Sequence, residues 1–227
     1  MFVGHFGLGF AAKRIAPQVS LGSLFFAVEF ADGLWPILLL AGIEHVRIVP
    51  GLMQASALDL YDYPWSHSLV ALCFWSALVG GAYDLARSSR RGAWVLAGLV
   101  LSHWFLDLVV HRPDMPVSPH GPYLGLGVWS SRMATLGVEG LFYVSGFALY
   151  VTITTAVDRT GIFALWVLFI LIAVLWLASL FGPPPPNVRT LALSGLLGWL
   201  FIPWGYWFDR HRRPRGAAVS AAFGARP

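Results

Sequence analysis

The sequence contains a single cysteine, Cys73, and this residue lies inside a long apolar run. One cysteine cannot form an intramolecular disulfide, so a disulfide framework is excluded and the redox compartment cannot be read from the sequence. Charged residues are also scarce: they make up 11% of a 227-residue chain that is 57% hydrophobic. This balance, with a mean hydropathy of +0.69, excludes an ordinary soluble domain. We therefore predict a membrane protein that crosses the bilayer several times.

Long apolar runs, in contrast, are abundant. Several approach the roughly 20 residues that a helix needs to cross a hydrocarbon core about 30 Å thick. They predict an all-α, polytopic helical bundle with about six transmembrane helices, at residues 20–40, 68–85, 93–110, 134–156, 163–181 and 191–208. In the first of these spans Pro36 follows Trp35, and a helix kink is expected there.

The remaining segments are expected to lie outside the six spans. Residues 1–12 are too short and too rich in glycine to span alone, so they predict a re-entrant or interfacial segment. Residues 43–64 are expected to form a loop along the membrane surface. We interpret residues 1–214 as one integral-membrane domain, and residues 215–227, rich in Ala, Gly and Arg, as a disordered cytoplasmic tail.

The formal net charge of +4 does not indicate nucleic-acid binding, because the basic residues cluster at the ends of the spans instead of forming one face with interleaved aromatics. Their placement reports membrane topology. One side would collect Lys13, Arg14, Arg87, Arg90, Arg91, Arg159, Arg210, Arg212, Arg213, Arg215 and Arg226, and the other Arg47, Arg112, Arg132 and Arg189. By the positive-inside rule both termini are expected in the cytoplasm, with His67 and residues 113–132 on the outer side.

The strongest candidate site lies in the third predicted span. His103, Asp107 and His111 recur every fourth residue, so on a helix they fall along one stripe. The residues between them are apolar, and polar groups on such a helix need a partner inside the membrane. This spacing predicts that the stripe binds a metal ion.

Four further residues could contribute to the same site. Asp32 and Glu29 lie near the middle of the first span, where a carboxylic acid must be protonated, paired or metal-bound. For Glu29, a protonated acid bonded to a neighbouring helix is an equal alternative. His67 follows Pro64, with Ser66 as the expected N-cap of the second span, and would face the same outer side as Asp107. His5 is either a residue near mid-membrane or an interfacial histidine.

Two more candidates have open alternatives, one in the outer loop after the third span and one about a turn inside the fourth span. Arg112 either binds an anionic oxygen of a substrate or pairs with Asp114. Glu139 is either an additional ligand or general base, or a structural carboxylate. Other titratable residues of the loop at 43–64 are expected to be solvated or paired with Arg47, and none is predicted to be a ligand; they are Glu44, His45, Asp59 and Asp62.

These residues carry a resemblance to a known family. With His5, Asp32, the Trp65-Ser66-His67-Ser68 segment and the His103-to-Asp107 pair, the first 140 or so residues resemble the predicted membrane-bound metal-dependent hydrolases, the YdjM-like group of the inner membrane. That group is distantly similar to zinc phospholipase C and nuclease P1. The resemblance implies an α-helical metal site formed by His5, Asp32, His67, His103 and Asp107, with His111 as a further ligand. The family's Pro-Asp-x-Asp motif is replaced here by Phe-Ala-Asp-Gly at residues 30–33.

Histidine and carboxylate ligands without cysteine suit zinc, or alternatively manganese, at a catalytic site with an open position. We therefore expect a hydrolase that uses metal-activated water on a phosphoester or related bond of a membrane lipid or lipid-linked substrate, with Asp32, Glu139 and Arg112 as catalytic residues. The site would open to the outer face of the inner or plasma membrane. The alternatives are a proton or divalent-cation transporter and a non-catalytic membrane scaffold with a structural metal.

Overall fold

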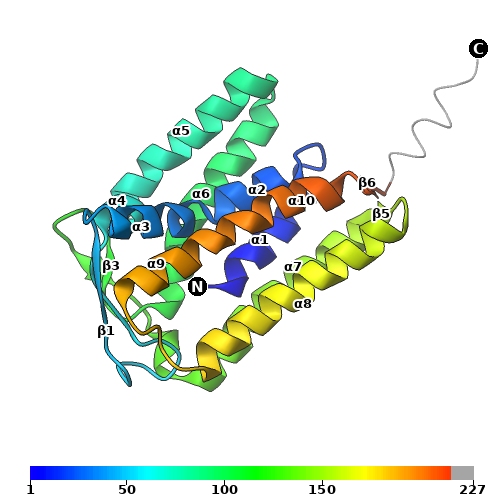
Figure 1. Cartoon of the computed structure of the whole chain (residues 1–227). Helices are drawn as coiled ribbons and strands as arrows, with labels where there is room; N and C mark the ends of the chain where they lie inside the picture. The colour runs from blue at the N-terminus through cyan, green and yellow to red at the C-terminus, as the bar shows by residue number, and fades with distance from the viewer. Residues whose placement is uncertain (216–227) are drawn as a thin grey trace, which may run out of the picture.

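The computed structural model describes residues 1–215, which form a bundle of α-helices with short strands in the connections (Figure 1). The all-α prediction is confirmed. The helices are α1 (Val3–Ala12), α2 (Leu21–Val28), α3 (Phe30–Leu40), α4 (Pro64–His67), α5 (Leu69–Arg87), α6 (Arg90–Val110), α7 (Arg132–Ile153), α8 (Arg159–Phe181), α9 (Val188–Leu196) and α10 (Phe201–Asp209), with 3-10 turns η1 (Val128–Ser130) and η2 (Leu197–Leu200). The strands pair antiparallel as β1 (His45–Ile48) with β2 (Leu58–Asp62), β3 (Met115–Pro116) with β4 (Tyr123–Leu124), and β5 (Thr154–Ala156) with β6 (Arg212–Pro214).

The helices agree with the predicted spans. Five are long and apolar enough to cross a membrane, namely α5, α6, α7, α8 and the continuous run from Val188 to Asp209 that contains α9, η2 and α10. A sixth span is possible if α2 and α3 are taken together. Large apolar side chains such as Phe74, Leu141 and Val167 point outward and are more than half exposed. An apolar outer surface of this kind is compatible with an integral membrane protein.

The first predicted span is broken, but not where proline predicted. The axes of α2 and α3 differ by 54°, and the break is at Glu29, which ends one helix and begins the next. The kink at Pro36 stays a prediction; α3 continues through this residue, whose ring packs close to Gly195 of α9. The last carbonyl groups of a helix have no hydrogen-bond donor within that helix. Val28 is the last residue of α2, so its carbonyl oxygen can accept a hydrogen bond from another helix.

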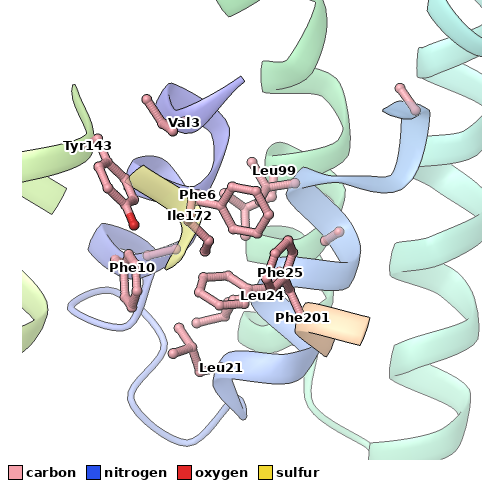
Figure 2. Close-up of a cluster of buried hydrophobic side chains, with 14 of the residues drawn as sticks. Val3, Phe6, Phe10, Leu21, Leu24, Phe25, Leu99, Tyr143, Ile172 and Phe201 are labelled. Carbon is pink, nitrogen blue, oxygen red and sulfur yellow. The ribbon is translucent and has the colours of Figure 1, made fainter. Parts of the chain in front are cut away.

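The N-terminal segment forms α1, which lies inside the bundle and not at its surface (Figures 1 and 2). Its ten residues are too few to span a bilayer. The interfacial alternative is wrong for a different reason: Phe6 and Phe10 are buried inside the bundle, in edge-to-face contacts with Phe25 of α2. Close approach to α7 depends on two glycines: a Cβ added to Gly146 would lie 1.9 Å from the carbonyl oxygen of Gly7.

Among the basic residues predicted for the cytoplasmic side, those within residues 1–215 gather at one end of the bundle. Lys13 pairs with Asp209 at the end of α10, at 2.6 Å, and β5 pairs with β6 to join the start of α8 to the residues after α10. Gly92 at the start of α6 lies against Val19, in the connection that follows Lys13. The loops that carry β1 to β4 lie at the opposite end (Figure 1).

Two predictions at the chain connections need correction. The hydroxyl of Ser68, not of Ser66, accepts the capping hydrogen bond at the start of α5, because α4 ends at His67 and α5 begins as a separate helix. The predicted loop at 43–64 contains the β1–β2 pair. The predicted tail at 215–227 falls outside the described residues except for Arg215, whose backbone N–H donates to the Ile153 carbonyl.

The contact between Gly7 and Gly146 leads to a prediction. We expect Gly146→Ala to destabilise the protein by about 1–3 kcal/mol, because a methyl group there forces α1 away from α7. Gly137→Ala on the same helix is the matched control, since a Cβ there would meet no atom within 4 Å. Thermal unfolding in detergent micelles would measure both, and equal midpoints for the two variants would contradict the packing described here.

Candidate metal centre

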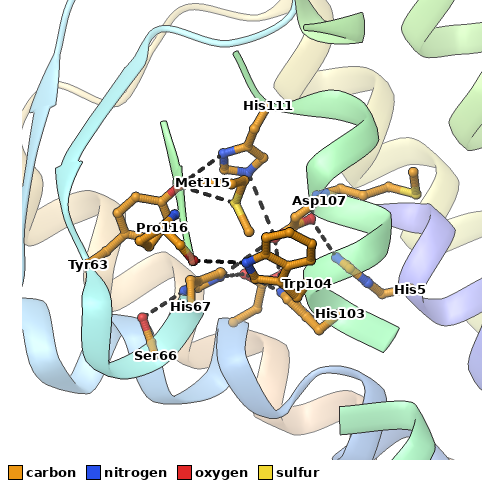
Figure 3. Close-up of polar contacts among 12 residues, drawn as sticks. His5, Tyr63, Ser66, His67, His103, Trp104, Asp107, His111, Met115 and Pro116 are labelled. Carbon is orange, nitrogen blue, oxygen red and sulfur yellow. Dashed lines mark hydrogen bonds and ion pairs between the residues drawn. The ribbon is translucent and has the colours of Figure 1, made fainter. Parts of the chain in front are cut away.

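Four segments bring five of the predicted ligands together in the centre of the bundle (Figure 3). Asp107 of α6 is 1% exposed and forms the middle of the cluster. Its Oδ1 lies 3.0 Å from Nε2 of His5 on α1, and its Oδ2 lies 3.2 Å from Nε2 of His103. Nε2 of His67 on α4 lies 3.3 Å from Oδ1 of Asp32 on α3 and 3.8 Å from Oδ2 of Asp107. The predicted convergence of these segments is thus present in the fold.

These side chains could hold a metal ion. Ligand atoms of His5, His103 and Asp107 lie within 4.8 Å of one another, and so do those of Asp32, His67 and His103. Both groups include His103, whose Nε2 is buried and has no hydrogen-bond partner within residues 1–215. A buried nitrogen left in this state between two carboxylates fits a cation-binding site, because buried polar atoms otherwise find partners. His103 offers this one nitrogen, so it can bind only one ion.

The orientation of His103 is fixed by the break between α2 and α3. Its Nδ1 lies 2.9 Å from the carbonyl oxygen of Val28, the last residue of α2. A carbonyl can only accept, so Nδ1 carries the proton and the lone pair of Nε2 faces the cluster. The ring also stacks on that of His5, with centroids 3.8 Å apart and planes inclined by 5°. The break at Glu29 thus has a role in the site that the sequence did not indicate.

His67 is oriented by a pair of residues that sequence reasoning missed. The Ser66 hydroxyl donates to Oε2 of Glu44 at 2.6 Å and lies 2.7 Å from Nδ1 of His67. Because the hydroxyl proton is used on Glu44, Ser66 must accept the proton of Nδ1, which leaves Nε2 free to bind a metal. Glu44 is 1% exposed and also accepts the backbone N–H groups of Trp65 and Ser66. The prediction that Glu44 is solvated or paired with Arg47 is wrong, because Glu44 is buried and accepts these three hydrogen bonds from α4.

His111 lies at the edge of the cluster. It is the first residue beyond α6, with Nε2 3.8 Å from Oδ2 of Asp107 and Nδ1 3.1 Å from Oδ1 of Asp114. Tyr63 adds a contact with Nδ1 of His111 at 3.3 Å and donates to the Asp114 carbonyl oxygen at 3.0 Å. Burial raises the pKa of the Tyr63 phenol well above its usual range, so this residue remains a donor.

Arg112 and Glu139 lie near the cluster, but both form hydrogen bonds or ion pairs with residues outside it. The guanidinium of Arg112 pairs with Asp59, and its Nε donates to Asp114 at 3.0 Å. Partial burial opposes the charge, but these two carboxylates raise the pKa of Arg112. Of the two open interpretations, pairing with Asp114 is the one that the geometry supports.

Glu139 lies on α7 and is 1% exposed. Its Oε2 accepts the backbone N–H groups of Phe2 and Val3, and its Oε1 accepts the indole N–H of Trp129 at 3.0 Å. Glu139 therefore holds the start of α1 in place, beside Asp107, whose carboxylate accepts the amino group of Met1. These contacts favour the structural interpretation of Glu139, and its role as a general base stays a prediction.

The cluster forms one wall of a cavity of about 710 Å³. Asp32, His67, Asp107 and His111 contribute the polar wall, and α8, α9 and α10 contribute an apolar one. Asp32 is the ligand with the largest exposure, since 36% of its side chain is accessible compared with 2% for Asp107. The cavity volume is within the range of small-molecule sites, so a ligand of moderate size can reach the metal-binding residues.

The contact between Ser66 and His67 yields a prediction. We expect Ser66→Ala to weaken zinc affinity about tenfold, because the His67 ring loses the acceptor that fixes its tautomer. Ser102→Ala is the matched control, since the Ser102 hydroxyl donates only to the Leu99 carbonyl of its own helix. Competition titration with a zinc chelator measures both affinities, and an unchanged affinity in Ser66→Ala would show that Ser66 and Glu44 do not orient the ligand.

No protein-family model matches the chain, and no curated protein and no solved structure is significantly similar to it.

Proposed function

We propose that this protein is a membrane-embedded, metal-dependent hydrolase that acts on a phosphoester or related bond of a lipid-associated substrate. One observation carries the proposal: the buried Nε2 of His103, which makes no hydrogen bond within residues 1–215, lies between the carboxylates of Asp107 and Asp32, at 3.2 and 3.6 Å, beside a cavity. Imidazole and carboxylate groups without thiolate are the kinds of ligand that catalytic zinc sites use, with manganese as the alternative metal.

Zinc bound there would act as a Lewis acid and lower the pKa of water towards about 7. The chain's own residues divide the remaining work. His5, His67, His103 and Asp107 are buried and would hold the ion, while Asp32, the most accessible carboxylate of the cluster, would orient water and take up its proton. Arg112 fixes Asp114 and through it His111.

The shape of the bundle favours hydrolysis over transport. A transport path would have to continue from the cluster to the basic end of the bundle. Phe6 and Phe10 of α1 lie along that direction and pack against Phe25, Phe147 and Tyr150, all of which are buried (Figure 2). Aromatic rings fill this space, whereas the cavity lies on the side of the loops. A reaction site reached from one side agrees with this arrangement.

The proposal includes an orientation in the membrane. The cavity is lined by the β1–β2 loop, by Trp129 and by the proline run at 183–185, and the basic residues gather at the other end. Under the positive-inside rule the basic end is cytoplasmic, and the cavity opens to the outer face of the inner or plasma membrane.

Labelling of single cysteines tests this orientation. In a Cys73→Ser background, His120→Cys is expected to react with an impermeant maleimide in intact cells, and Arg91→Cys is expected to react only after the membrane is opened. Both positions are exposed, so folding should not limit the reaction. The opposite pattern would reverse the orientation.

The metal itself is tested by zinc content and hydrolysis. We expect purified protein to bind zinc, and His103→Ala and Asp107→Ala to lose both the zinc and the release of headgroups from phospholipid vesicles. Chelation should abolish activity in the wild type, and added zinc should restore it. His211→Ala is the control, because His211 pairs with Asp158 at the basic end. Unchanged metal content in both ligand variants would refute the proposal.

A further inference from the structure

Arg132 is a cavity residue that the sequence did not single out. It begins α7, and its side chain lines the cavity that also contains the metal-binding cluster. Its Nη2 donates to the backbone carbonyl of Gln54 at 2.9 Å, and its guanidinium lies 5.1 Å from the centre of the Phe181 ring. These contacts fix the position of the side chain without neutralising its charge.

The charge of Arg132 has no carboxylate partner in the part of the chain that the structure describes. The arginine–carboxylate pairs there are formed by Arg47 and Arg112. The Nε of Arg132 is buried and makes no hydrogen bond within residues 1–215. A guanidinium that faces a cavity without a counter-charge is suited to bind an anionic oxygen group, which its planar array of donors matches.

Two more hydrogen-bond donors that line the cavity lack an acceptor within residues 1–215. The indole N–H groups of Trp35 and Trp176 are buried and have no partner within residues 1–215. Trp35 lies edge-on to His67, with ring centroids 6.3 Å apart, so one such donor is close to the proposed metal ligands. Buried donors without a partner around one cavity indicate a ligand that carries oxygen acceptors.

The opposite wall of the cavity is apolar. Leu180, Leu191, Phe201 and Ile202 line it, together with the prolines at 183–185. The helices that carry these residues contribute no carboxylate or imidazole to the cavity. A ligand that satisfies both walls has an anionic headgroup and an apolar chain.

The spacing along α7 places the anionic group near the reacting bond. Arg132 and Glu139 are seven residues apart on one face of the helix, which corresponds to a rise of about 10 Å. Glu139 holds the start of α1 beside Asp107. A headgroup that lies between them can therefore contact Arg132 at one end and the metal-binding cluster at the other.

We infer that the cavity binds an amphiphile with an anionic oxygen group and an apolar chain, and that Arg132 binds this group. The inference rests on the proposed function and names its substrate class: an anionic amphiphile, whether its charge is a phosphate or a carboxylate.

Binding measurements test this inference separately from catalysis. The full-length protein in a neutral detergent would be titrated with oleoyl lysophosphatidic acid, with monooleoylglycerol as the uncharged lipid of the same chain, and with inorganic phosphate. Each titration is made with zinc and again after chelation, so that neither turnover nor the metal decides the result. The variants are Arg132→Gln, Arg132→Lys and, as the control, the exposed Arg91→Gln at the basic end. Thermal unfolding checks that each is folded.

We expect Arg132→Gln to weaken binding of the anionic lipid about tenfold or more and to leave monooleoylglycerol unchanged, as for the loss of a charged hydrogen bond. Arg132→Lys should recover part of the loss, and Arg91→Gln should match the wild type.

Equal binding by the wild type and Arg132→Gln, or an equal loss for both lipids, would overturn the inference. Inorganic phosphate that binds as tightly as the lipid would overturn the role of the apolar wall. If anionic-lipid binding depends on Arg132 but no zinc binds and no bond is cleaved, the inference stands and the proposed function fails.

Discussion

The structure depends on the burial of one carboxylate. Asp107 is almost inaccessible within a helix whose neighbouring residues are apolar, and an isolated charge there would cost several kcal/mol. Four imidazoles lie within 4 Å of its two oxygens, those of His5, His67, His103 and His111. These contacts bring α1, α4 and α6 together at one point. The carbonyl of Val28, at the break between α2 and α3, then orients His103.

The loops at the cavity end complete the site by orienting its ligands. Glu44 reaches His67 through Ser66, and Asp114 reaches His111, so each ring has an acceptor at Nδ1 and presents Nε2 to the cluster. Arg112 pairs with both Asp114 and Asp59. It therefore joins the loop at residues 112–122, which follows α6, to strand β2 of the β1–β2 pair. The connections are therefore part of the site.

The cavity is built from two halves of the chain with different chemistry. Helices α1 to α6 provide the metal-binding residues, whereas α8 to α10 form an apolar wall and carry no residue of the cluster. Along the sequence, α8 to α10 show no candidate metal ligand. Their role becomes visible only when they are packed opposite Asp32 and His67, where an apolar surface beside polar groups can accommodate an amphiphile.

How much the sequence determined follows from the range of the interactions involved. Hydrophobic runs and the spacing of four residues between His103, Asp107 and His111 are local properties of a helix, so the spans and the polar stripe could be predicted directly. The break at Glu29, the burial of Glu44 and the position of the Arg132 guanidinium at the cavity depend on contacts between residues far apart in the chain. Glu44 and Ser66, for example, are 22 positions apart. Proline at 36 was the local signal for a bend, yet the helix break lies at Glu29 and α3 continues through Pro36. Sequence alone thus determined which residues could bind a metal, and the tertiary structure decided which of them meet, because only folding sets the distances between separate helices.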